Sequence, residues 1–126
     1  MKCLLDTHVL LWWIEDDPRL RAQPRAAIID PDNDVVVSAA TIWEAAIKRA
    51  LGKLRFETPV LLDTLSRGGI RVLPITAEHA PTAGDLPRHH DDPFDRMLVA
   101  QAIAEGLTVI PRDAWFRSYQ VAIIRA

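Results

Sequence analysis

Short, continuously apolar runs alternate along this chain with longer segments that have helical spacing. Such runs, without polar alternation, are typical of parallel strands that are buried on both faces. Helical segments between them supply the crossovers that parallel strands require. The sequence therefore predicts an α/β fold in three layers, with a central, mostly parallel, five-stranded sheet and helices on both faces. The expected strands are Lys2–Asp6, Val35–Val37, Ile70–Pro74, Leu107–Ile110 and Val121–Ile124.

Turn and capping residues mark the ends of the segments between these runs. Gly52 and Gly106 each follow a helical segment directly, as glycines that end helices do. With 126 residues, the chain is expected to form one domain over residues 1–126. The expected helices are Thr7–Ile14, Arg19–Ile29, Ala39 or Thr41 to Leu51, Pro59–Ser66, Ala77–Ala83 and Pro93–Glu105, with a short helical turn ending at Tyr119.

Charge and cysteine content limit the classes of function. The net charge of −2 provides no broad basic field, so nucleic-acid binding would need a local basic patch. Cys3 is the only cysteine, which excludes an internal disulfide and fits a reducing compartment such as the cytoplasm. Asp6 and His8 interrupt the apolar N-terminal run, so we expect neither a signal peptide nor a membrane span.

The stretch His89–Arg96 places three carboxylates and two imidazoles directly before an apolar helix. Pro93 suits the first helical position and Asp92 suits the N-cap. Asp95 lies in the first turn, where the positive end of the helix dipole stabilises anions. Two interpretations are open at this point: Asp92 and Asp95 form a capping pair, or they bind a cation.

Other acids follow the ends of predicted strands. Asp6 ends the first strand, Glu44 lies six residues after Ser38, and Asp113 lies three residues after the fourth strand. Since ligands of parallel α/β sheets bind at the carboxyl ends of the strands, these acids are expected to converge there with Asp92 and Asp95.

Each of these residues also has a structural interpretation. Asp6, Asp113 and Ser38 are suitable helix caps. Glu44 has a capping-box partner in Thr41 and an ion-pair partner in Lys48.

Converging carboxylates favour a metal site over separate caps. Two carboxylates about 6 Å apart repel by about 3 kcal/mol at an effective dielectric constant of ~20, so a group of them calls for a cation. Carboxylate oxygens and water suit Mg²⁺ or Mn²⁺, and such ions activate water against a phosphodiester. One cysteine and scattered histidines do not have the spacing of a zinc site.

Three motifs in this order resemble the PIN-domain ribonucleases, specifically the VapC-type toxins of bacterial toxin–antitoxin pairs. The resemblance covers nearly the whole chain, and the third motif is the most specific. The motifs are Leu4–Trp13, Val37–Lys48 and Leu86–Ala102.

The resemblance implies RNA cleavage that depends on Mg²⁺ or Mn²⁺. Thr7 and Ser38 would support the acids by hydrogen bonding. By motif position, the catalytic acids would be Asp6, Glu44, Asp95 and Asp113, and the metal ligands would be Asp6, Glu44, Asp92, Asp95 and Asp113.

The same resemblance implies a homodimer and a small VapB-like antitoxin that masks the acidic site. Basic side chains around the site are candidates for phosphate contacts with RNA, although each is equally well explained as solvated surface. The candidates for substrate binding are Arg88, His90, Arg96 and Arg112.

Two other functions stay open. Many relatives have Thr or Ser where this chain has Pro111, which weakens the role of Asp113 and allows a PIN-like binding module without catalytic activity. The second open function is that of a phosphotransfer domain in which Asp6 is the nucleophile. Against it, no Asp lies two residues after Asp6 and no Lys follows a late strand.

Overall fold

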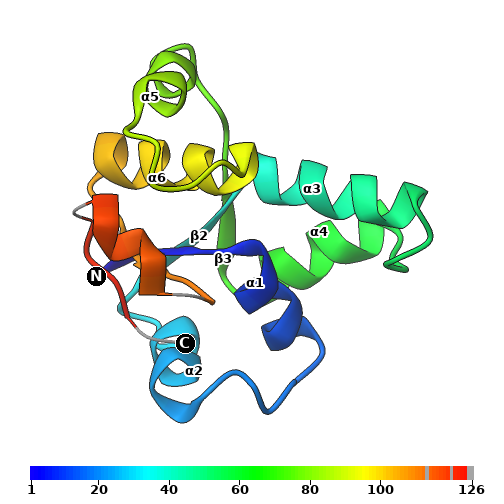
Figure 1. Cartoon of the computed structure of the whole chain (residues 1–126). Helices are drawn as coiled ribbons and strands as arrows, with labels where there is room; N and C mark the ends of the chain where they lie inside the picture. The colour runs from blue at the N-terminus through cyan, green and yellow to red at the C-terminus, as the bar shows by residue number, and fades with distance from the viewer. Residues whose placement is uncertain (113, 120, 125–126) are drawn as a thin grey trace.

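The computed structural model describes residues 1–112, 114–119 and 121–124, and it places a parallel sheet between two layers of helices (Figure 1). None of the helices in these ranges has the length and apolar character needed to cross a membrane. The elements, in chain order, are β1 (Lys2–Leu5), α1 (Thr7–Ile14), α2 (Ala22–Ile29), β2 (Asp34–Ser38), α3 (Ala39–Ala50), α4 (Thr58–Arg67), β3 (Ile70–Leu73), α5 (His79–Asp85), α6 (Pro93–Glu105), β4 (Thr108–Ile110) and the 3-10 helix η1 (Ala114–Tyr119).

All strand pairs in the sheet are parallel, and the strand order is β3-β2-β1-β4. Leu5, the last residue of β1, pairs with Val37 on one side and with Ile110 on the other. The chain moves from β1 to β2 and β3 on one side and then crosses to β4 on the other side of β1, so the strand order reverses between β1 and β4. In sheets of this kind, a ligand-binding crevice opens at the carboxyl ends of the strands where the order reverses. Asp6 follows β1 at this point.

The predicted fifth strand is wrong, because the sheet has four strands among the residues that the structure describes. Residues 121–124 pair with the sheet only through an isolated parallel bridge between Val109 and Ile123. Val109 N–H donates to the carbonyl of Ala122 at 2.8 Å, and Ile124 N–H donates to the carbonyl of Val109 at 2.9 Å. Residues 121–124 therefore lie beside β4 at one position but do not form a strand.

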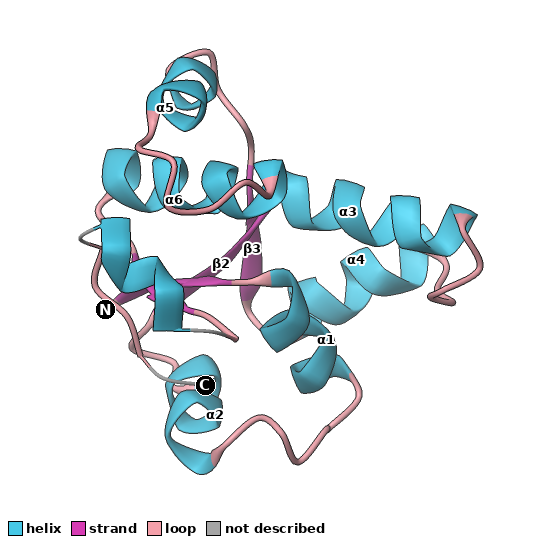
Figure 2. Ribbon diagram, in the orientation of Figure 1, coloured by secondary structure: helices cyan, strands magenta, loops and turns pink. Residues whose placement is uncertain are grey.

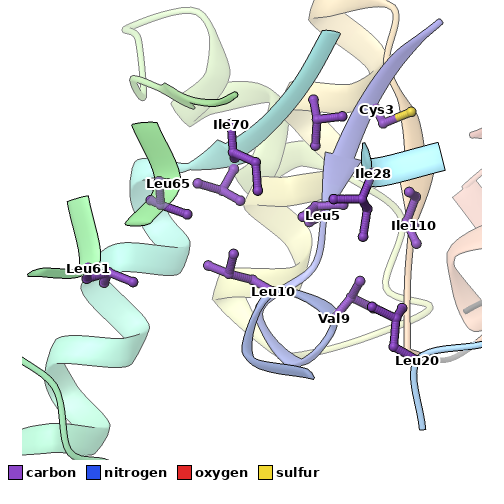
Figure 3. Close-up of a cluster of buried hydrophobic side chains, with 12 residues drawn as sticks. Cys3, Leu5, Val9, Leu10, Leu20, Ile28, Leu61, Leu65, Ile70 and Ile110 are labelled. Carbon is purple, nitrogen blue, oxygen red and sulfur yellow. The ribbon is translucent and has the colours of Figure 1, made fainter. Parts of the chain in front are cut away.

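The apolar runs bury both faces of the sheet, which confirms the predicted helix–sheet–helix layers. Cys3 and Leu5 of β1 pack in a cluster with side chains of α1, α2 and α4, and Figure 3 shows this cluster. Leu4, between them in sequence, packs in a second cluster with α6 and η1. Figure 2 shows α6 on one side of the strands and α2 on the other. Alternate residues of one strand thus serve two cores, which is why the strands show no polar alternation.

Local hydrogen bonds explain where several of the helices begin and end. Asp92 Oδ1 accepts from the N–H of Phe94 at 2.8 Å and of Asp95 at 3.3 Å, so the predicted N-cap of α6 is confirmed. Gly106 ends α6 in the left-handed region, with a φ of 66°. The predicted start of α2 at Arg19 is wrong, because Arg19 is held in a turn by its bonds to Asp17.

The predicted start of α5 at Ala77 is also wrong, and the helix begins at His79. The hydroxyl of Thr76 accepts from His79 N–H at 3.4 Å, and Thr76 N–H donates to His79 Nδ1 at 3.0 Å. These two bonds hold the residues before His79 in a turn.

Gly68, at the C-terminal end of α4, packs directly against the indole of Trp13. A Cβ at this position would overlap the Trp13 ring, although the backbone conformation itself suits any residue, with a φ of −80°. Trp13 packs on the first core cluster, so its ring has little freedom to move. We expect Gly68→Ala to lower the free energy of unfolding by about 1–3 kcal/mol, as overpacking does, in urea denaturation.

Gly84→Ala is the matched control, because a Cβ there meets no atom within 4 Å. It replaces glycine in α5 by a better helix former, so we expect a gain of up to about 1 kcal/mol. Equal effects of the two substitutions would contradict the close approach of Trp13.

Candidate functional site

Asp6 is almost completely buried where β1 ends. Its Oδ1 accepts from Val9 N–H at 2.8 Å, which confirms that Asp6 caps α1. Its Oδ2 accepts from the N–H of Arg112 at 2.6 Å. Two charge-assisted hydrogen bonds to backbone N–H groups stabilise the ionised carboxylate in this buried place. Asp6 therefore joins the end of β1 to the segment that follows β4, as well as capping a helix.

Glu44 of α3 is oriented by residues of two helices. Its Oε1 accepts from the Thr7 hydroxyl at 2.6 Å, and the Thr7 hydroxyl also hydrogen-bonds the Thr41 hydroxyl at 3.2 Å. Glu44 Oε2 lies 3.7 Å from Lys48 Nζ, so the predicted ion pair is confirmed. The alternative of a Thr41–Glu44 capping box is wrong, because Ser38 caps α3 by accepting from Ala40 N–H.

The N-terminal end of α6 brings together one imidazole and two carboxylates. Donor atoms of His90, Asp92 and Asp95 all lie within 4.8 Å of one another. His90 Nε2 lies 3.0 Å from Asp95 Oδ2. Among the residues that the structure describes, this is the group that could hold a metal ion, and Asp6 and Glu44 are not part of it.

The electrostatic environment of Asp95 disfavours its ionised form. Burial, followed by repulsion from Asp92, raises its pKa to about 6, against an ordinary value of 3.8, and Glu44 adds to the rise. The hydrogen bond from His90 acts in the opposite direction. The contribution of Glu44 means that the acids of α3 and α6 interact, as the contact between these helices allows.

This shift predicts how stability depends on pH when no divalent cation is present. Between about pH 4 and pH 6, the folded chain keeps a proton on Asp95 that the unfolded chain releases. Above pH 6 the carboxylate is ionised in both states, and the folded state then carries its full cost, on the order of 3 kcal/mol. Lowering the pH from 7.5 to 5 should therefore recover about 1.5 kcal/mol of unfolding free energy from this group.

Urea denaturation in EDTA at the two pH values measures this difference. Asp95→Asn removes the titrating group, so the unfolding free energy of this variant should not show that rise between pH 7.5 and pH 5. An identical pH dependence in both proteins would contradict the assignment.

Arg96, one residue after Asp95, fixes the loop that carries His90. Its guanidinium donates to the carbonyls of Pro87 and His90 through Nη1, at 3.1 and 3.2 Å. Through Nη2 it donates to three more carbonyls, those of Ala83, Gly84 and Leu86. Arg96 was expected to bind substrate, but these bonds direct its guanidinium into the loop instead of toward a phosphate. The sequence gives no signal for this role, because the acceptors are backbone carbonyls.

The structure separates the remaining candidates. Arg88 is exposed on the same loop. Arg112 contributes its backbone N–H to Asp6. Ser38 is fully buried and serves as the N-cap of α3, with its hydroxyl oxygen accepting from Ala40 N–H at 3.0 Å. Asp113, expected to be a catalytic acid and metal ligand, lies outside the described residues.

Comparisons with known proteins identify the family of this chain. Residues 3–121 match the family described as the PIN domain. Ribonuclease VapC22 of Mycobacterium tuberculosis is 33% identical over 120 residues, which cover 93% of this chain and 91% of that protein.

Two of the similar solved structures illustrate the likeness in fold. One is VapBC2 of Rickettsia felis bound to a promoter DNA fragment, with a TM-score of 0.74, 18% identity and 98% of each chain covered. The other is FitAcB of Neisseria gonorrhoeae, with a TM-score of 0.67, 24% identity, and 98% of this chain and 96% of that chain covered. At these identities the two structures support the fold. The family match over residues 3–121 and the 33% identity to Ribonuclease VapC22 place the chain in the PIN-domain family, as a VapC-type member.

Proposed function

We propose that this chain is a divalent-metal-dependent endoribonuclease and the toxin of a toxin–antitoxin pair. The observation that carries the proposal is the group formed by His90, Asp92 and Asp95, where burial and mutual repulsion hold the pKa of Asp95 near 6. The identity of 33% to a protein named as a ribonuclease supports RNA as the substrate.

The donor set fits a hard divalent cation. A carboxylate whose pKa is raised by burial and by neighbouring carboxylates is stabilised when a cation enters, because attraction to the cation then offsets both the loss of hydration and the repulsion. Carboxylate oxygens suit Mg²⁺ and Mn²⁺, and an imidazole near them is better suited to Mn²⁺. Asp92 and Asp95 are the carboxylates of this group, and by motif position we propose Asp6, Glu44 and Asp113 as further metal ligands.

The protein's own groups would prepare the site for hydrolysis of a phosphodiester bond. When bound, the cation would supply an activated water and neutralise charge on the phosphate. Asp92 Oδ1 is engaged by the first turn of α6, which leaves its other oxygen to face the site. Thr7 orients Glu44 through a 2.6 Å hydrogen bond, and Arg96 fixes the backbone of His90.

We also propose a homodimer that is inhibited by a VapB-like antitoxin. The likeness to chains of VapBC and FitAcB structures supports this partner. Close to the acidic group, Trp43 is 61% exposed and contacts the Phe94 ring edge-on, with 5.1 Å between ring centroids. An exposed tryptophan of this kind suits a protein interface.

A cleavage assay with controlled metal content tests the proposal. The purified chain should cut structured RNA with Mg²⁺ or Mn²⁺ and should stop in EDTA, with activity restored by added metal. Titration calorimetry should detect divalent binding by the isolated chain. RNA that stays intact, together with no heat of metal binding, would favour the PIN-like binding module without catalytic activity.

A further inference from the structure

A second charged feature lies outside the acidic site, at the segment that joins α3 to α4. Lys48, Arg49, Lys53 and Arg55 place four of the chain's 15 cations within eight residues, in a protein whose net charge is −2. We call these four residues the basic turn. Figure 1 shows the connecting segment at the outer edge of the molecule.

Backbone hydrogen bonds fix the geometry of the basic turn. Gly52 ends α3 in the left-handed region, with a φ of 74°. Its N–H donates to the carbonyl of Arg49 at 3.0 Å, and Lys53 N–H donates to the carbonyl of Lys48 at 2.9 Å. This pair of bonds is the Schellman motif, which terminates a helix in a defined conformation. The backbone that leads from α3 to Lys53 therefore has a defined conformation.

The stability of α3 explains only two of the four cations in the basic turn. Cations in the last turn of a helix offset its dipole, which accounts for Lys48 and Arg49. Lys53 and Arg55 lie beyond the helix, and both are exposed. Neither forms an ion pair with any described residue. Their charges are thus available to a ligand.

An aromatic ring lies among these cations. The guanidinium of Arg49 stacks over the Phe56 ring at 4.4 Å and donates to the Thr58 hydroxyl at 3.1 Å. Arg49, Arg55 and Phe56 line an open hollow of about 590 Å³, which also has Glu57 in its wall. Proteins that bind single-stranded nucleic acid combine a positive groove with aromatic rings on which bases stack.

The basic turn begins beside the acidic site. Lys48 Nζ lies 3.7 Å from Glu44 Oε2, and Glu44 is a proposed metal ligand. From Glu44 to Arg49, α3 rises only about 8 Å at 1.5 Å per residue. A ligand whose phosphate is at the acids can thus continue along α3 to the hollow. This continuity favours the substrate over an acidic peptide as the ligand.

We propose that the basic turn binds the phosphodiester backbone of the RNA substrate, next to the position of cleavage. Arg55 supplies a planar fork for a phosphate, Lys53 supplies a point charge, and the Arg49–Phe56 pair supports a base. This inference rests on the proposed function, because the proposed ligand of the basic turn is the same RNA that the acidic site would cleave.

RNA binding by charge-reversed variants tests this surface. The binding assay uses the full chain with Asp95→Asn, so that RNA is not cut, and measures the fluorescence anisotropy of a labelled single-stranded RNA. Adding Lys53→Glu and Arg55→Glu should weaken binding tenfold or more. The slope of log K against log salt should fall by about 1.4, since each lost phosphate contact on a single strand removes about 0.7.

Arg21→Glu with Arg67→Glu is the matched control, because it changes the net charge equally at exposed positions elsewhere. We expect the control to alter affinity less than twofold. In the active protein, Lys53→Glu with Arg55→Glu should raise KM much more than it lowers kcat. If the reversed variant is unfolded by circular dichroism, Lys53→Gln with Arg55→Gln replaces it.

Three results would overturn the inference while leaving the proposed function intact. The first is equal RNA affinity in the parent and in the charge-reversed variant. The second is an equal loss of RNA affinity in the matched control. The third is loss of affinity for a synthetic acidic peptide without loss for RNA, which would assign the surface to a protein partner. A parent protein that neither cuts RNA nor binds divalent ions would contradict the proposed function itself.

Discussion

Asp95→Asn is expected to reduce RNA cleavage by a factor of about 10³ or more while making the metal-free protein more stable. A loss of this size corresponds to about 4 kcal/mol of transition-state stabilisation, which is reasonable for removing one carboxylate that binds a catalytic cation. The gain in stability follows from the raised pKa of Asp95: near pH 7.5 its charge is buried and repelled by Asp92. An amide keeps the shape of the side chain and removes the charge.

Two measurements on one preparation check both halves of this expectation. Cleavage is followed with Mn²⁺ or Mg²⁺, and thermal unfolding is followed in EDTA. Asp91→Asn is the matched control, since Asp91 is an exposed acid in the same stretch and lies outside the group of His90, Asp92 and Asp95. Its activity and stability should stay close to those of the parent. Full activity in Asp95→Asn, or a lower unfolding temperature, would contradict the role given to this carboxylate.

Arg96→Met is expected to lower the free energy of unfolding by about 3 kcal/mol. The substitution keeps much of the aliphatic stem but removes the donor group that five backbone carbonyls share. Hydrogen bonds from a charged donor contribute about 1.5–3 kcal/mol, and acceptors left without partners add a desolvation cost. The loop that presents His90 should also lose its fixed position, so cleavage should fall with stability.

Arg67→Met provides the comparison for Arg96→Met in urea denaturation. Arg67 pairs with Asp63 on the surface of α4, and both side chains are largely exposed. Exposed pairs contribute little, so its effect should be within about 0.5 kcal/mol. Similar losses in the two variants would mean that Arg96 does not hold the loop through its guanidinium.

Features set by neighbouring residues could be predicted from the sequence. The bounds of α6 follow from Asp92 and Pro93 at one end and Gly106 at the other, all of which act within one turn. The parallel strands and the two helical layers follow from apolar runs without alternation. Capping and site formation were treated as alternatives for Asp6 and Asp92, whereas a carboxylate has two oxygens and can cap a helix with one of them.

Features set by distant contacts could not be predicted. Residues 121–124 are as apolar as a strand, but only one residue pair reaches β4. Thr7 orients Glu44 because β1 and β2 are neighbours, which places the starts of α1 and α3 together. Arg96 has the appearance of a phosphate ligand in the sequence, and only the path of the loop from Ala83 to His90 supplies its acceptors.

The bond between Asp6 and the backbone of Arg112 has a consequence for the order of folding. Asp6 acquires the environment described above only when the segment after β4 has docked beside β1, although the two residues are 106 positions apart in the sequence. A fragment that ends before this segment would carry the acids of all three motifs and still lack the bond that fixes the first of them. The geometry of Asp6 is therefore completed late in folding, after the sheet has gained its last strand.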